Sequence, residues 1–299
     1  MIEVAPRIAA VLAAGGAVVA LETTIVTHGM PFPQNVETAL EVEALVRANG
    51  AEPATIAVVD GRIRVGLEPD AIRALAGMRN VRKVSRADLP FTVATGQAGA
   101  TTVAATMIAA ALAGIAVFAT GGIGGVHRGA ESTLDISADL DELARTPVAV
   151  VCAGAKALLD LPKTLEVLET RGVPVICYRS DDFPAFWSRS SGLRAPLRLD
   201  SATEIAAAIR MQRALGYSSG TLIANPVDAA DEIPPDQIGA HIDAAVAAAT
   251  ATGISGKDVT PFLLDRLLDL TGGRSLATNI ALIKSNARLA ATIAVELTR

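Results

Sequence analysis

The chain of 299 residues carries a formal net charge of -5, and 51% of its residues are hydrophobic while only 3% are aromatic. This length allows one or two domains with a large core, and the mean hydropathy of +0.42 comes mostly from Ala, Val, Leu and Ile. An acidic chain without a basic cluster disfavours nucleic acid as a partner, and no apolar run reaches the roughly 18 uncharged residues of a membrane span. We therefore expect a cytoplasmic globular protein that binds neither nucleic acid nor membranes.

Strand-like and helix-like segments alternate along the chain. Short apolar runs predict strands, and longer stretches with helical spacing predict helices. In chain order the sequence predicts a strand at 17–24, a helix at 35–50, a hairpin at 54–66, a helix at 101–114, strands at 115–120 and 148–154, a helix at 161–172, strands at 173–178 and 220–226, and helices from about 234 to 299.

The strands are continuously apolar, which indicates a sheet covered on both faces, and their alternation with helices favours parallel pairing. We predict one α/β domain over residues 1–299, layered α/β/α, with a mostly parallel central sheet and a helical C-terminal part. Ligands of such sheets bind beyond the carboxyl ends of the strands. The loops after Leu21, Thr120, Ala153 and Ala224 are therefore the candidate site.

Glu22 ends the first predicted strand, within ALETTIVTHGMPFPQN. A charged carboxyl is costly to bury among Val, Ala, Leu and Ile. One interpretation is a solvated strand end without a special role. The other is a carboxyl whose pKa burial raises into the range of a general acid.

The stretch ATGGIGGVHRGAESTLDISADL is typical of a glycine loop that approaches phosphate through backbone amides. It is not a dinucleotide fingerprint, because His127 occupies the third glycine position, and it lacks the lysine of a Walker-type loop. A lone carboxylate with water ligands would suit Mg²⁺ or Mn²⁺. The alternative is a solvated acidic helix start that Asp139 caps.

Lys156 follows the apolar run of VVCAGAK. It could be a strand-edge lysine that extends its amine to water. It could also be a partly desolvated amine that acts as a neutral nucleophile in imine chemistry.

Asn279 and Asn286 lie on an apolar helix predicted after Gly273, where buried amides must either join helices or reach a ligand. Cys152 and Cys177 lie in strand-like runs and are expected to be reduced core thiols.

These motifs resemble the pseudouridine-5'-phosphate glycosidase family, also described as indigoidine-synthase-A-like. The resemblance extends from about residue 17 to 290, and its most specific segments are FATGGIGGVHRGAE and VCAGAK. Further matching stretches are ALETTIVTHGMPFPQN, KVSRADLPF, IANPV and TPFLLDRLLDLTGGRSLATNIAL, whereas YRSDDFPAFWSRSSGLRAPLRLD matches more loosely.

The resemblance implies reversible cleavage of the C–C glycosidic bond of pseudouridine 5'-phosphate into uracil and ribose 5-phosphate. It implies Mn²⁺ or another divalent cation, one per subunit, and a homotrimer. Lys156 would be the nucleophile that forms a ring-opened imine adduct with the sugar, and Glu22 the proton donor. Asp135 would bind the metal. The implied substrate contacts are Lys83, Val103, Ser137, Ala138 and Asp139 and, by a looser match, Thr120, His127 and Asn279.

Two other functions stay open at this point. One is a different Schiff-base lyase or aldolase that uses the same lysine on another sugar phosphate. The other is a non-enzymatic sugar-phosphate sensor, which would need the pocket but not both Lys156 and Glu22.

Overall fold

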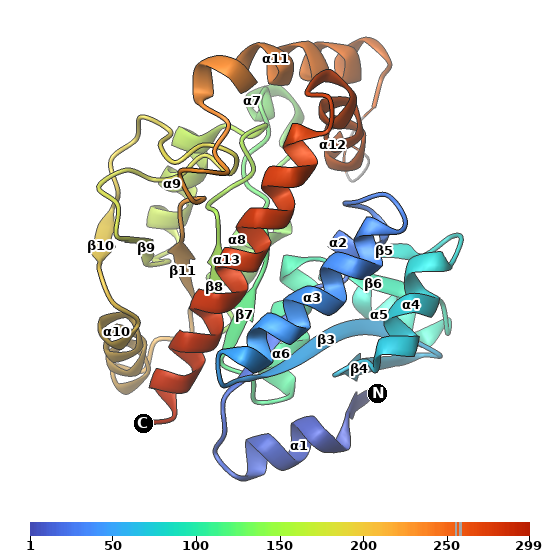
Figure 1. The fold of residues 1–299 in the computed structure, drawn as a ribbon, viewed down its shortest axis with the longest axis vertical. Helices are drawn as coiled ribbons and strands as arrows, with labels where there is room; N and C mark the ends of the chain where they lie inside the picture. Colours follow the sequence, from blue (N-terminus) through green and yellow to red (C-terminus); the bar gives the residue numbers. More distant parts are fainter. Residues whose placement is uncertain (255, 257–258) are drawn as a thin grey trace.

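A mixed sheet runs through the centre of the computed structural model, which describes residues 1–254, 256 and 259–299 (Figure 1). Along its main path the strand order is β1-β4-β3-β2-β7-β8-β11-β9-β10, while β6 pairs with β3 and β5 pairs with β6. The strands are β1 (Ile2–Val4), β2 (Val18–Leu21), β3 (Glu52–Val59), β4 (Arg62–Val65), β5 (Arg82–Val84), β6 (Gly99–Thr101), β7 (Val117–Ala119), β8 (Ala149–Cys152), β9 (Val175–Tyr178), β10 (Leu197–Leu199) and β11 (Thr221–Ala224).

The prediction of a mostly parallel sheet is confirmed. Only the pairs of β3 with β4 and of β3 with β6 are antiparallel among the described strands. The β3–β4 hairpin turns at Asp60 and Gly61, whose φ angles of 51° and 68° are those of a tight two-residue turn. All residues of β2, β7, β8 and β11 are buried, as expected for strands that are covered on both faces.

Helices cover both faces of the sheet and give the predicted α/β/α layers (Figure 1). The long helix α13 crosses one face beside α3, and α6 packs with α8 on the other. The helices are α1 (Pro6–Ala13), α2 (Thr24–Thr27), α3 (Gln34–Ala48), α4 (Pro69–Gly77), α5 (Leu89–Ala94), α6 (Val103–Leu112), α7 (Ala130–Thr133), α8 (Ala138–Leu143), α9 (Leu161–Thr170), α10 (Ala202–Ala214), α11 (Pro235–Ala251), α12 (Val259–Leu270) and α13 (Arg274–Leu297).

Four strands were not predicted, and one predicted helix begins too early. Strands β1, β5, β6 and β10 have three residues each, which is too short for an apolar period to be visible in the sequence. The helix predicted from residue 101 begins at Val103, because Thr102 caps it and accepts a hydrogen bond from the amide of Ala105 at 3.5 Å.

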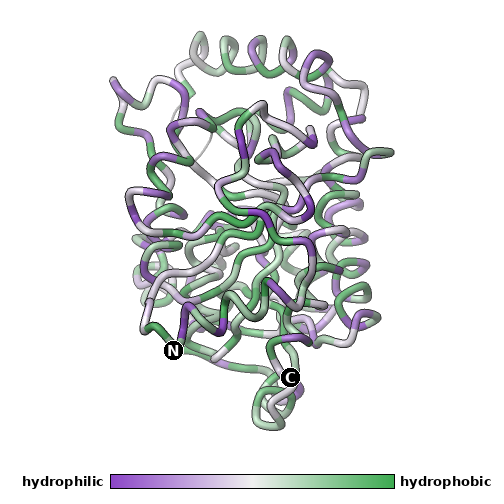
Figure 2. Tube along the Cα trace, turned by 90° about the vertical axis from the view of Figure 1, so that its left-hand side faces the viewer, coloured by the Kyte–Doolittle hydropathy of each residue, from purple (hydrophilic) through white to green (hydrophobic). Residues whose placement is uncertain are grey.

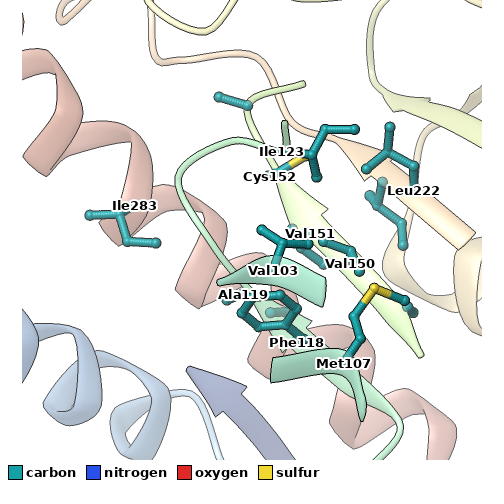
Figure 3. Packing of buried hydrophobic residues seen from close by; sticks show 14 of the residues in the cluster. Val103, Met107, Phe118, Ala119, Ile123, Val150, Val151, Cys152, Leu222 and Ile283 are labelled. Carbon is teal, nitrogen blue, oxygen red and sulfur yellow. The ribbon is translucent and has the colours of Figure 1, made fainter. Parts of the chain in front are cut away.

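The core joins α6, the sheet and α13. Figure 3 shows Val103 and Met107 of α6 packed near Phe118 of β7 and Val150 of β8. In Figure 2 the segments through the middle of the molecule are mostly hydrophobic, whereas the outer helices alternate between hydrophilic and hydrophobic positions. The predicted core thiols, Cys152 and Cys177, are free and buried. Within the described ranges, no helix is both long enough and apolar enough to cross a membrane.

Candidate active site

A cavity of about 460 Å³ opens beyond the carboxyl ends of β2, β7 and β8. This is the edge at which the sequence places a ligand site. All eleven site residues implied by the family resemblance line it: Glu22, Lys83, Val103, Thr120, His127, Asp135, Ser137, Ala138, Asp139, Lys156 and Asn279.

Lys156 reaches the cavity from the turn that follows β8. The turn is held against the glycine loop by a bridge between Ala155 and Ile123 and by a hydrogen bond from the Lys156 amide to the Ile123 carbonyl, at 3.2 Å. The Lys156 amine, Nζ, donates to the carbonyl oxygen of Gly122 at 2.6 Å. The lysine is therefore partly buried and directed inward, not extended to water along the strand edge.

Glu22 follows β2 and lies within the same cavity. Its carboxylate oxygens accept hydrogen bonds from the hydroxyls of Thr24 and Thr120. Burial raises the pKa of Glu22 above its ordinary value of 4.5, and this effect outweighs the opposing influence of the Lys156 charge and the two threonines. Glu22 consequently keeps its proton to higher pH than an exposed glutamate, as a proton donor requires.

The glycine loop owes its composition to close packing. A Cβ at Gly124 would lie 2.2 Å from Ser137 Oγ, and one at Gly125 would lie 2.5 Å from Thr164 Oγ1. The amide of Ile123 donates to the Gly154 carbonyl at 3.1 Å, and that of Gly124 donates to Asp139 at 2.8 Å. These two amides are therefore occupied within the protein, and the loop differs here from the expected phosphate cradle.

Asp139 holds two parts of the cavity wall together. One carboxylate oxygen accepts from the Gly124 amide at 2.8 Å, and the other accepts from the Ala104 amide in the first turn of α6 at 2.9 Å. The carboxylate therefore joins the glycine loop to the start of α6. The beginning of α6 at Val103 and the cation of Lys83 give this side of the cavity a positive character that suits an anionic ligand.

His127 and Asp135 are neighbours on the cavity wall, and the His127 amide donates to the Asp135 carbonyl at 3.0 Å. His127 Nδ1 is 3.8 Å from Asp135 Oδ2, and burial lowers the pKa of His127 below its ordinary value of 6.5. At neutral pH the imidazole is then neutral. A single carboxylate of this kind, partly open to the cavity, matches a divalent cation that keeps several water ligands. No group of three or more His, Cys, Asp or Glu side chains that could hold a metal occurs among the described residues.

Asn279 and Asn286 have different surroundings, although both belong to α13. Asn279 lines the cavity, and its carboxamide oxygen is buried without a hydrogen-bond partner. Asn286 is fully buried and donates to the carbonyls of Thr120 and Gly121, at 2.8 and 3.4 Å. The loop after Ala224, predicted as part of the site, reaches it only indirectly, because Asn225 donates to Asn286 at 3.0 Å.

The cavity also has walls that the sequence did not reveal. Arg86 lines it while its guanidinium binds the buried carboxylate of Glu142, at 2.6 and 3.2 Å. Phe186 comes from an irregular segment, and Leu264 comes from α12. Arg86 lies within KVSRADLPF and Leu264 within TPFLLDRLLDLTGGRSLATNIAL, so their motifs were usable signals, whereas Phe186 occurs in the stretch that matches only loosely.

The fold and cavity define an α/β enzyme that places a lysine amine and a buried carboxyl with a raised pKa in one site. The chain belongs to the family described as indigoidine synthase A like protein, whose model matches residues 7–296. It is 68% identical over 297 residues to a pseudouridine-5'-phosphate glycosidase of Methylobacterium nodulans, covering 99% of this chain and 88% of the relative. A pseudouridine-5'-phosphate glycosidase of Solibacter usitatus is 61% identical, with 99% of each chain covered.

Solved structures agree with this assignment. The prealnumycin C-glycosynthase AlnA, in complex with ribulose 5-phosphate, superposes with a TM-score of 0.92 at 38% identity, covering 100% of this chain and 97% of its own. An indigoidine synthase A-like protein of Thermotoga maritima gives a TM-score of 0.91 at 34% identity, with the same coverage. The likeness therefore extends over the whole chain and not the site alone.

The raised pKa of Glu22 predicts a pH-dependent gain in stability for Glu22→Gln. The folded chain binds this proton more tightly than the unfolded chain, so Glu22 lowers stability as pH rises through the window above 4.5. A glutamine cannot ionise. We expect Glu22→Gln to have a higher Tm than the wild type at pH 8, with the difference shrinking as the pH falls to 4.5 and below.

Thermal melts between pH 4 and pH 8 check this expectation. The control is Glu166→Gln at an exposed position of α9, which should leave the pH dependence of Tm unchanged. A Tm of Glu22→Gln below that of the wild type at pH 8 would contradict the assignment.

Proposed function

We propose that this protein cleaves the C–C glycosidic bond of pseudouridine 5'-phosphate reversibly, giving uracil and ribose 5-phosphate, through an adduct between Lys156 and the sugar. The observation that carries the proposal is the meeting of the Lys156 amine and the Glu22 carboxyl in one cavity. The curated relatives named as pseudouridine-5'-phosphate glycosidases, at 61–68% identity over 99% of this chain, support the same reaction.

The chemistry of the bond explains the need for a lysine. Ordinary glycosidases protonate a leaving oxygen between two carboxyl groups, but a C–C glycosidic bond has no such oxygen. The neutral amine displaces the ring oxygen from C1', which opens the sugar ring and leaves an amine adduct. The nitrogen lone pair then forms an imine with C1' as the bond to C5 of the base breaks, and C5 takes up a proton. Water hydrolyses the imine and releases ribose 5-phosphate, as in other Schiff-base lysines.

Glu22 is placed to manage the proton in this reaction. Opening of the ring requires a proton on the ring oxygen, and a carboxyl with a raised pKa keeps its proton to higher pH than an exposed glutamate. Thr24 and Thr120 fix the orientation of the carboxyl. We assign Glu22 as the proton donor and Lys156 as the nucleophile.

The positive side of the cavity would hold the phosphate. Lys83, the start of α6 at Val103 and residues 135–139 line that side, and the binding energy of the phosphate can hold C1' against Lys156. Thr120, His127 and the unpartnered oxygen of Asn279 would contact the rest of the substrate.

Asp135 would hold a divalent cation, Mn²⁺ in the first instance, with water as its other main ligand. A bound cation would supply positive charge beside the anionic substrate. The neighbouring imidazole of His127, which burial keeps neutral, does not compete by charge repulsion.

A second reaction of the same site deserves a direct comparison, since AlnA is named as a C-glycosynthase. The same adduct could accept another carbon nucleophile or break another sugar phosphate. An assay that mixes several carbon acceptors and sugar phosphates separates these reactions from pseudouridine 5'-phosphate cleavage. A non-enzymatic sensor would have no use for the Lys156–Glu22 arrangement.

We expect Lys156→Ala to lower turnover of pseudouridine 5'-phosphate by several orders of magnitude while substrate still binds, because no other side chain at that position supplies a primary amine. Glu22→Ala should lower turnover by about 10²- to 10⁴-fold. The two losses should not add, since both residues act on one adduct.

Borohydride trapping with ribose 5-phosphate, read by mass spectrometry, should add one pentose phosphate to the peptide that contains Lys156. Lys163→Ala is the matched control, because Lys163 is exposed and pairs with Glu131 and Asp160 at the surface. A label on another lysine, or near-normal turnover by Lys156→Ala, would refute the mechanism.

The metal proposal predicts that EDTA abolishes turnover and that Mn²⁺ restores it, while the Tm stays nearly the same. Titration calorimetry should find Mn²⁺ binding that Asp135→Asn removes. Asp243→Asn, at a surface carboxylate that pairs with Arg128, should bind Mn²⁺ as the wild type does. Full turnover by the metal-stripped protein would end the proposal.

We also propose a homotrimer. Large apolar side chains such as Phe32, Leu134 and Leu215, which are 71%, 79% and 67% exposed in the single chain, are consistent with subunit contacts. Light scattering at micromolar concentration should give three times the chain mass of 30.6 kDa. A mass of one chain would show the proposal to be wrong.

A further inference from the structure

Residues 120–122, which we call the linking segment, contact both reactive groups of the cavity. At one end the Thr120 hydroxyl donates to Glu22, and at the other the Gly122 carbonyl accepts from Lys156 Nζ at 2.6 Å. The segment follows directly after β7. Its position therefore determines how the carboxyl and the amine lie relative to each other.

Asn286 holds the linking segment from the side of α13. Its side-chain amide donates to the carbonyls of Thr120 and Gly121, at 2.8 and 3.4 Å. Its carboxamide oxygen accepts from Asn225 at 3.0 Å, and Asn225 also donates to Ser285 at 3.1 Å. Asn286 has an exposed fraction of 0%, so it acts on the segment and not on a ligand.

Phe186 presses on the same segment from the cavity side. A Cβ built on Gly122 would lie 2.6 Å from the Phe186 ring, and one built on Gly121 would lie 3.7 Å from it. The ring is packed edge-on against Trp187, with 4.9 Å between the ring centroids.

The backbone of Phe186 is strained. Its φ of 59° is in the left-handed region, which a bulky aromatic residue rarely adopts, and its amide donates to the Ala153 carbonyl at 3.1 Å. Glycine would adopt this φ without strain. In Phe186 the packing contacts of the ring must therefore offset the free-energy cost of the backbone conformation. Strain of this kind concentrates at functional sites.

We propose that Asn286 and Phe186 are positioning residues that fix the linking segment from opposite sides and thereby set the Lys156 amine and the Glu22 carboxyl for reaction. The inference rests on the proposed function. Neither residue needs to touch the reacting atoms. Misplacement of a reacting group by about 1 Å is enough to cost roughly 100-fold in rate, so two fixed contacts on a short segment are sufficient for the effect.

Asn286→Leu and Phe186→Leu test the two contacts separately, since the first removes the amide that donates to Thr120 and Gly121 and the second removes the ring beside Gly122. We expect kcat to fall by roughly 10- to 100-fold in each, with KM changed by less than about threefold, because the proposed substrate contacts, such as Lys83 and Val103, remain. Thr278→Val is the matched control. Thr278 is 3% exposed on the same helix, but its hydroxyl donates to Asp231, away from the linking segment.

A double-mutant cycle tests whether Phe186 and the linking segment act together. Gly122→Ala should abolish most activity, because the added Cβ collides with the Phe186 ring. In a Phe186→Ala background the same change should cost much less. If the activity losses of Gly122→Ala and Phe186→Ala simply multiply in the double variant, the two residues do not act together and the role of Phe186 is overturned.

A measurement that does not need turnover separates this proposal from the proposed function. Reductive methylation with formaldehyde and cyanoborohydride reports the reactivity of the Lys156 amine in the peptide mass spectrum. We expect Asn286→Leu and Phe186→Leu to change its methylation rate at least about threefold, and Thr278→Val to leave it unchanged.

If the wild type does not cleave pseudouridine 5'-phosphate, the proposed function fails, and the methylation rates still decide whether the two residues position Lys156. Methylation rates equal to the wild type in both leucine variants would overturn the positioning role. So would a kcat loss in Thr278→Val as large as theirs at equal Tm.

Discussion

The cost of keeping a carboxyl group inside an apolar sheet shapes most of this site. Glu22 follows a fully buried strand, and burial raises its pKa although the Lys156 charge and two threonine hydroxyls oppose that rise. Burial is therefore what favours the protonated carboxyl, while the two hydroxyls and the Lys156 charge limit the rise in its pKa. A close salt bridge would have stabilised the charged form and removed the acid.

Close packing of backbone explains how the amine is brought to that acid. Glycines at 122, 124 and 125 leave no Cβ between the loop and its neighbours, so the carbonyl of Gly122 can accept from Lys156 and the amide of Gly124 can donate to Asp139. The same carboxylate binds the first turn of α6. One short loop thus orients the nucleophile and holds the wall that would bind the phosphate.

Much of this arrangement could be predicted from the sequence, because strand ends in parallel sheets meet at one edge. Glu22 and Lys156 end apolar runs, and that position alone brought them together. The contribution of Phe186 could not be predicted, since it depends on a left-handed backbone within an irregular segment. The two backbone amides bound by Asp139 were also hidden, because a sequence does not show which backbone groups a carboxylate will meet.

The place of α13 has a consequence for how the chain is made. A ribosome synthesises the sheet before this helix, yet α13 covers the face formed by β2, β7 and β8 and supplies both Asn279 and Asn286 (Figure 1). During synthesis that apolar face stays exposed to solvent until α13 packs against it. Exposed apolar surface of this kind promotes aggregation. The sheet consequently cannot be covered on this face, nor the cavity completed, before α13 has been synthesised.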